Sequence, residues 1–106
     1  MPKYLVKASY TVEGVKGLLK EGGTSRKKEV EKMINELGGK VEAFYFAFGD
    51  TDVFAILDLP DAESASAASL TINASGYTNI SLTVLITPDE ADRAVRKTVS
   101  YTPPGK

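Results

Sequence analysis

The chain has 106 residues, a length that suits one domain built around a single hydrophobic core. Thirteen basic and fourteen acidic residues leave a formal net charge of -1, which argues against nucleic acid or an anionic membrane surface as a partner. The chain has no cysteine and no histidine, which excludes disulfides, thiol nucleophiles and a serine-histidine-acid triad.

The first third of the chain predicts a strand followed by two helices. Apolar and polar side chains alternate from Tyr4 to Tyr10, as in a strand with one buried face. Thr11 is placed to cap a short helix that runs to Lys20. A second helix follows a glycine pair, with Thr24 or Ser25 as its expected cap. Its apolar residues recur at helical spacing: Val30, Met33, Ile34 and Leu37.

A β-hairpin signal occupies the middle of the chain, from Val41 to Leu59, with the polar tetrad Gly49–Asp52 as its turn. A four-residue loop predicts three cross-strand pairs: Phe48 with Val53, Phe46 with Ala55, and Phe44 with Leu57. The opposite face carries a second, largely apolar set: Ala43, Tyr45, Ala47, Phe54 and Ile56. Because one layer of helices covers only one face of an antiparallel sheet, we expect a second subunit or a closed pocket on the other.

The rest of the chain predicts a helix, a strand and a short helix. Residues 62–75 consist mostly of Ala and Ser, which predicts a helix lying close to the sheet, with a flexible linker as the alternative. The alternating segment Ile80 to Thr87 predicts the fourth strand. Thr87 to Glu90 then combines a cap residue, a proline and a glutamate, the pattern of a helix start.

That last helix is expected to run to Lys97, and Thr98 to Tyr101 is a candidate edge strand at the start of an extended tail that covers about residues 98–106. The resulting order is strand, helix, strand, strand, helix, strand, with a split first helix and a C-terminal helix and tail. This order predicts an α+β, ferredoxin-like βαββαβ fold with a four-stranded antiparallel sheet, in one domain that spans residues 1–106.

Four residues are candidates for ligand binding: Tyr10, Arg26, Tyr45 and Asp52. The two tyrosines offer phenol groups beside apolar rings, although core packing is the default interpretation for both. Arg26 lies near a helix start after two glycines, a place suited to a carboxylate or phosphate ligand, although a solvated basic turn is the more ordinary interpretation. We therefore expect a cavity between the central sheet and the loop Gly22 to Arg26 that takes a small anionic or polar-aromatic ligand.

Turn chemistry favours Asp52 as a turn residue that hydrogen-bonds its own backbone, and the alternative is a carboxylate that binds magnesium or a substrate. A calcium loop does not fit, because Phe54 and Ala55 stand where an oxygen ligand and a glycine are needed. We expect no metal and no resident cofactor.

Three segments together resemble the GYD domain family: Ser9 to Gly14, Lys20 to Arg26, and Leu37 to Gly49. The family is named for a glycine, tyrosine and aspartate cluster at the central hairpin turn. Gly49 and Asp52 fit that cluster, whereas Thr51 stands where tyrosine is usual. The resemblance implies a ferredoxin-like fold of the dimeric α/β-barrel group, whose relatives include small enzymes, monooxygenases and ligand-binding modules.

These observations leave three kinds of function open. The first is a small-molecule-binding or sensing module assembled as a homodimer or higher oligomer. The second is a cofactor-independent enzyme, isomerase- or monooxygenase-like, that acts through tyrosine and carboxylate groups, and the third is a purely structural assembly unit. The missing histidine favours the first and the third. With no export-signal pattern and no apolar run of the roughly 20 residues that span a bilayer, a cytoplasmic protein without a membrane partner is expected.

Overall fold

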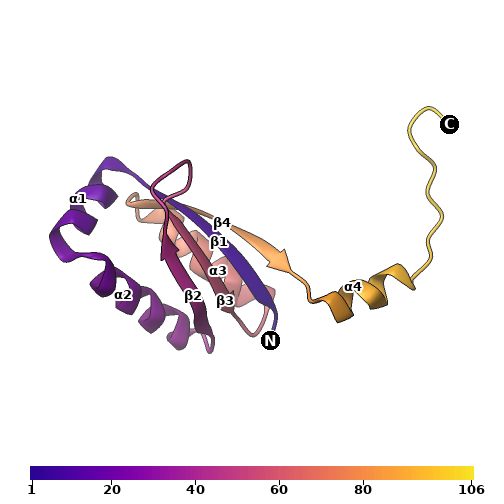
Figure 1. The fold of residues 1–106 in the computed structure, drawn as a ribbon, viewed down its shortest axis with the longest axis horizontal. Coiled ribbons are helices and arrows are strands. Elements are labelled where there is room, and N and C mark those ends of the chain that lie inside the picture. Colours follow the sequence, from indigo (N-terminus) through magenta and orange to yellow (C-terminus); the bar gives the residue numbers. More distant parts are fainter.

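A computed structural model describes residues 1–106, which form one four-stranded antiparallel sheet with helices on one of its faces (Figure 1). The elements in chain order are β1 Lys3–Tyr10, α1 Val12–Glu21, α2 Gly23–Glu36, β2 Lys40–Phe46, β3 Val53–Asp58, α3 Ala62–Ala74, β4 Thr78–Leu85 and α4 Pro88–Val95. The strands lie in the order β2-β3-β1-β4, which confirms the predicted α+β, ferredoxin-like fold. None of the four helices combines the length and the apolar character needed to span a bilayer.

The first predicted helix is split into α1 and α2, as expected. Thr11 caps α1 by accepting a hydrogen bond from the Gly14 amide at 3.2 Å. The cap predicted for α2 at Thr24 or Ser25 is wrong, because α2 begins at Gly23 and has no side-chain cap. The single residue Gly22, at φ 84°, turns the chain directly from one helix into the next. Glycine adopts that left-handed backbone without a steric penalty, so no loop remains in which a capping side chain could sit.

The hairpin forms, but its predicted register is wrong by two residues. Phe46 pairs with Val53 and Phe44 with Ala55, so residues 47–52 form a longer connection than the predicted tetrad. Asp52 anchors this connection to β1, because its amide donates a hydrogen bond to the Ala8 carbonyl at 2.8 Å. A shift of two residues leaves every side chain on its predicted face.

The strand β2 also contains an irregularity between Val41 and Ala43, where one extra residue is inserted. This bulge returns Val41 to the same face as Phe44, although the two residues are three positions apart. Both therefore face the helices.

The second half of the chain confirms the helix predicted over residues 62–75 and rules out the linker alternative. Asp61 caps α3 by accepting a hydrogen bond from the Ser64 amide at 2.7 Å.

After β4 the chain leaves the sheet, and α4 with the following residues projects away from it (Figure 1). The edge strand predicted at Thr98 to Tyr101 is therefore wrong, because no sheet edge lies beside that segment for it to pair with.

The two faces of the sheet differ in what covers them. The face under α2 and α3, here called the covered face, supplies most of the buried core: Tyr4, Val6, Ala8, Val53, Ala55 and Leu57. No helix packs on the opposite face, here called the open face, which carries Leu5, Ala43, Tyr45, Phe54 and Ile56. Only 12 of the 106 residues are buried, so much apolar surface remains accessible in a single chain.

Candidate functional site

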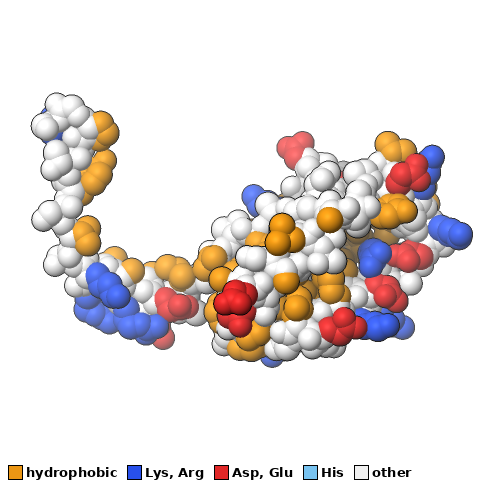
Figure 2. All heavy atoms as spheres, turned by 180° about the vertical axis from the view of Figure 1, so that it is seen from behind, with side chains coloured by type: hydrophobic (Ala, Val, Ile, Leu, Met, Phe, Trp, Pro, Cys, Tyr) orange, Lys and Arg blue, Asp and Glu red, His pale blue; other side chains and the backbone are white.

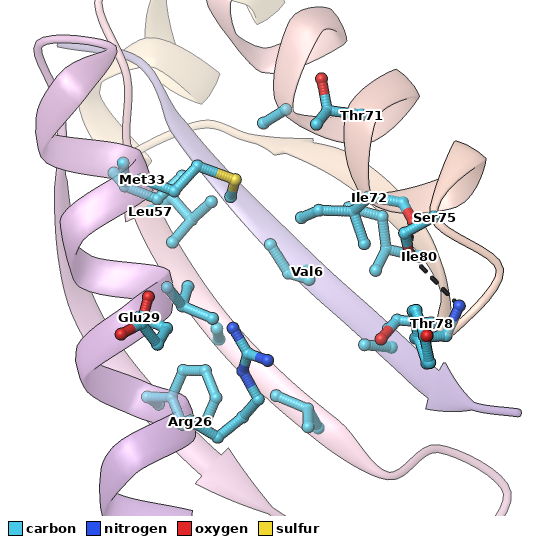
Figure 3. Close-up of a pocket in the computed structure, with 18 of the residues that line it drawn as sticks. Val6, Arg26, Glu29, Met33, Leu57, Thr71, Ile72, Ser75, Thr78 and Ile80 are labelled. Carbon is cyan, nitrogen blue, oxygen red and sulfur yellow. Dashed lines mark hydrogen bonds between the residues drawn. The ribbon is translucent and has the colours of Figure 1, made fainter. Parts of the chain in front are cut away.

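A cavity of about 400 Å³ lies between α2 and α3, with the covered face of the sheet as its floor (Figure 3). Val6, Ala8 and Ala55 line its floor, and these short side chains do not fill the space between the two helices. Ala68 of α3 is buried and also lines the cavity, and its short side chain likewise leaves space unfilled. Fifteen of the twenty lining residues are hydrophobic, so the cavity favours an apolar ligand.

Arg26 supplies a cation to this cavity from the first turns of α2. Figure 3 shows its guanidinium group pointing from the helix toward the space above the strands. Its Nη1 lies 3.3 Å from Glu21 Oε1, and both side chains are about one third exposed, at 37% and 34%. This ion pair is therefore open to solvent, and an anionic ligand can compete with Glu21 for the guanidinium.

Tyr10 lines the same cavity from the end of β1. Burial raises the pKa of its phenol above the ordinary value of 10.0, Arg26 opposes this shift, and the nearby carboxylates of Asp52 and Glu21 add to it. The phenol therefore stays protonated near neutral pH and can donate a hydrogen bond to a ligand oxygen.

The wall formed by α3 and β4 adds hydroxyl groups that sequence reasoning did not single out. Thr71, Ser75 and Thr78 line the cavity on this side, opposite Arg26 (Figure 3). The Ser75 hydroxyl is engaged locally, since it donates to the Ile72 carbonyl at 2.6 Å and accepts from the Tyr77 amide at 3.2 Å. Nothing in the serine- and threonine-rich sequence of α3 distinguishes the residues that face the cavity, because that depends on how the helix is rotated against the sheet.

Two of the four predicted ligand-binding residues, Tyr10 and Arg26, lie together at this cavity. Tyr45 lies on the open face of the sheet, 69% exposed and away from the cavity. Asp52 lies outside the cavity lining, and its side chain bonds another strand rather than its own turn, since its Oδ2 accepts a hydrogen bond from the Tyr10 amide at 2.8 Å. Asp52 thereby fixes the end of β1 and acts on the cavity through the position of Tyr10.

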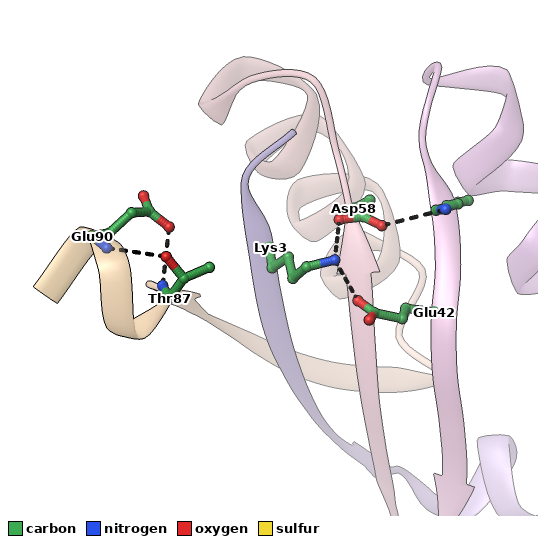
Figure 4. Close-up of polar contacts among 6 residues, drawn as sticks. Lys3, Glu42, Asp58, Thr87 and Glu90 are labelled. Carbon is green, nitrogen blue, oxygen red and sulfur yellow. Dashed lines mark hydrogen bonds and ion pairs between the residues drawn. The ribbon is translucent and has the colours of Figure 1, made fainter.

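A separate charged cluster lies at one end of the open face (Figure 4). Lys3 Nζ bonds Asp58 Oδ1 at 2.8 Å and Glu42 Oε2 at 2.7 Å, and Lys40 Nζ lies 4.0 Å from Asp58. The hydrogen bond from Lys3 lowers the pKa of Asp58, although burial of that carboxyl opposes the shift. Because these charges are paired with one another, the cluster stabilises the ends of three strands. No group of three or more acidic side chains is placed to hold a metal ion.

Comparison with known proteins agrees with the fold and with the resemblance seen in the sequence. The sequence model of the GYD domain matches residues 4–95, which extend from the start of β1 to the end of α4. Comparisons with curated proteins and with solved structures found no match. The match covers most of the chain and all eight of its helices and strands, and the chain therefore belongs to the GYD domain family.

Proposed function

We propose that this protein binds a small, largely apolar molecule with an anionic or polar-aromatic head in the cavity between α2 and α3. The observation that carries this proposal is the arrangement of the cavity, which has an apolar floor and two charged lining residues, Arg26 and Glu29, of which Arg26 points its guanidinium group into the space above the strands (Figure 3). Its volume of about 400 Å³ falls within the range of small-molecule sites.

The apolar floor supplies the affinity for the body of the ligand. Burial of apolar surface contributes about 25 cal/mol per Å², and the floor and helix walls offer such surface on three sides. Met33 and Ile72 face each other across the space in Figure 3, so a chain or ring placed there contacts both helices.

Arg26 and Tyr10 supply the selectivity for the head of the ligand. A carboxylate accepts charge-assisted hydrogen bonds from the guanidinium and a further bond from the protonated phenol. A ligand with a cationic head meets Arg26 as a like charge, and a neutral alcohol gains only part of these interactions. The site therefore favours anions over neutral or cationic molecules of the same apolar size.

Titration with three probes of equal chain length tests the proposal: decanoate, decanol and decyltrimethylammonium. We expect decanoate to bind most tightly, with amide chemical-shift changes on both α2 and α3. Arg26→Ala should weaken decanoate binding by about tenfold, the effect of losing a charged hydrogen bond of roughly 1.5 kcal/mol, and leave decanol unchanged. Lys27→Ala, at the next position of the same helix, is the matched control and should change neither.

Thr71→Trp should block all three probes, because Thr71 is an exposed residue on the cavity wall and a large ring there occupies the space. Equal affinity of the wild-type protein for decanoate and decanol, or unchanged decanoate affinity in Arg26→Ala, would refute the anion preference. Shifts confined to residues away from α2 and α3, or no binding at all, would refute the cavity as the site and favour the purely structural alternative.

We also propose that the chain forms a homodimer or higher oligomer through the open face of the sheet. Tyr45 is 69% and Phe54 37% exposed on this face, and no element of the same chain covers them. Neighbouring exposed apolar side chains on one face of a sheet are typical of a protein interface. Light scattering coupled to size exclusion should give a mass of at least twice 11.4 kDa at micromolar concentration, and a monomer at every concentration would contradict the proposal.

A further inference from the structure

The C-terminal segment of residues 86–106, here called the arm, stands apart from the rest of the chain (Figures 1 and 2). The molecule measures 55 × 34 × 22 Å, with a radius of gyration of 16.8 Å. A compact chain of this length has a radius of about 13 Å. The excess comes from the arm, in which every residue but Ala91 is exposed.

The arm has one apolar side along its length. In α4 the residues Ala91, Ala94 and Val95 fall on one side of the helix, and Asp89 and Arg93 fall on the other. Large apolar side chains before, within and after the helix are exposed: Ile86 59%, Val95 79%, Val99 88% and Tyr101 74%. Figure 2 shows apolar atoms along one side of the arm and the blue cations gathered on the opposite side of α4.

The helix α4 is formed in spite of its position away from the sheet. Thr87 Oγ1 accepts from the Glu90 amide at 3.1 Å, and Glu90 Oε1 accepts from the Thr87 amide at 3.0 Å, which completes a capping box. A helix of eight residues is nevertheless too short to persist in water without tertiary packing. Its apolar side therefore needs a surface that the same chain does not provide.

We propose that this surface belongs to a second copy of the chain, so that each arm packs its apolar side on the body of the other copy. The proposal rests on the oligomer proposed above and assigns the arm to its interface. Reciprocal exchange of two identical arms closes in a two-fold dimer and leaves neither arm uncovered.

The charges of the arm favour a second copy over a membrane or nucleic acid. The arm carries three acidic and four basic residues, whereas residues 1–85 carry eleven acidic and nine basic residues. Arm and body therefore have opposite net charges, which favours contact between the arm of one copy and the body of another. A membrane-binding or nucleic-acid-binding arm would instead carry a strong excess of cations.

Intermolecular paramagnetic relaxation enhancement tests where the arm packs. The chain has no cysteine, so Val99→Cys provides a unique position for a nitroxide label. Labelled protein is mixed with ¹⁵N-labelled wild-type protein that carries no nitroxide, and broadening is measured only on the latter. We expect the nitroxide to broaden amide resonances of residues 1–85 in the wild-type copy. If no amide of the wild-type copy is broadened, the proposal is overturned. The control label at Leu70→Cys, on a side chain that is also exposed, at 71%, should give a different or empty pattern.

Substitution of the arm tests its contribution to assembly. Val95→Glu combined with Val99→Glu should weaken self-association by about 30-fold or more, the loss expected when interface anchors are removed. Leu70→Glu makes the same chemical change at a comparably exposed residue of α3 and should leave self-association unchanged. Because these residues are exposed in the single chain, folding of the body is expected to persist in both variants.

The possible failures are distinguishable. Unchanged self-association in the arm variant, together with dissociation by Phe54→Glu, would overturn the arm and keep the open face. Dissociation only in the arm variant would keep the arm and overturn the open face as an interface. A wild-type chain that stays monomeric at all concentrations would overturn both proposals.

Discussion

The two faces of the sheet are built from the same strands and are both rich in apolar side chains, yet only one of them is buried by helices of the same chain. On β3 the residues Val53, Ala55 and Leu57 are each 3% exposed under the helices, whereas Phe54, between the first two, is 37% exposed on the open face. Hydrophobicity alone therefore does not decide which face becomes the core. The decision comes from the connections, which carry α2 and α3 to the same side and leave the other side uncovered by any helix.

The largest expected effect is on the covered face. Leu57→Ala should lower the free energy of unfolding by about 2 to 5 kcal/mol, because Leu57 is buried and its truncation removes apolar contacts and enlarges the adjacent cavity. Tyr45→Ala on the open face should cost less than about 1 kcal/mol under conditions where the chain is monomeric. Urea denaturation at low protein concentration measures both values, and similar losses would show that the two faces are equally packed within one chain.

Self-association provides the complementary test of the open face. Phe54→Glu should weaken it by about 30-fold, because a charge would replace a ring of the proposed interface, and should leave the unfolding of the monomer nearly unchanged. Sedimentation velocity over a concentration series measures the change. If Phe54→Glu unfolds the isolated chain instead, then the open face belongs to the core of a single chain.

The same contrast between covered and open surfaces exists within the single helix α1. Gly14 is buried against the Tyr77 carbonyl, and a methyl group there would overlap that oxygen, so Gly14→Ala should cost about 1 to 3 kcal/mol. Gly17 has no atom near its Cβ position, so Gly17→Ala should stabilise the helix by up to about 1 kcal/mol. Thermal unfolding of both variants measures the pair, and equal shifts of the same sign would contradict the close approach at Gly14.

The smallest expected effect concerns the charged end of the open face. The pKa of Asp58 is lowered from 3.8, chiefly by the hydrogen bond from Lys3, so the ionised carboxylate stabilises the folded state. This stabilisation is complete above pH 3.8 and is lost as the pH falls through the lower, folded-state pKa. Asp58→Asn should therefore reduce the melting temperature near neutral pH, and its difference from wild type should shrink below pH 3.8. A difference that is independent of pH would assign the effect to packing.

The sequence predicted the elements and the faces well because both depend on local periodicity. It missed the hairpin register because the connection is held by Asp52, which bonds Ala8 and the Tyr10 amide on a strand distant in sequence. In the cavity, Tyr10 and Arg26 were predictable from their places at a strand end and a helix start. Thr71 and Thr78 were not, because their orientation depends on how α3 and β4 pack together.

The bulge between Val41 and Ala43 has a consequence for how the family can vary in length. In a regular strand, the insertion or deletion of one residue exchanges the two faces for every position beyond it. At the bulge, deletion of the extra residue restores plain alternation and leaves Val41 and Phe44 facing the helices. This one site in β2 can therefore absorb a single-residue deletion during evolution, whereas changes elsewhere in the sheet must come in pairs.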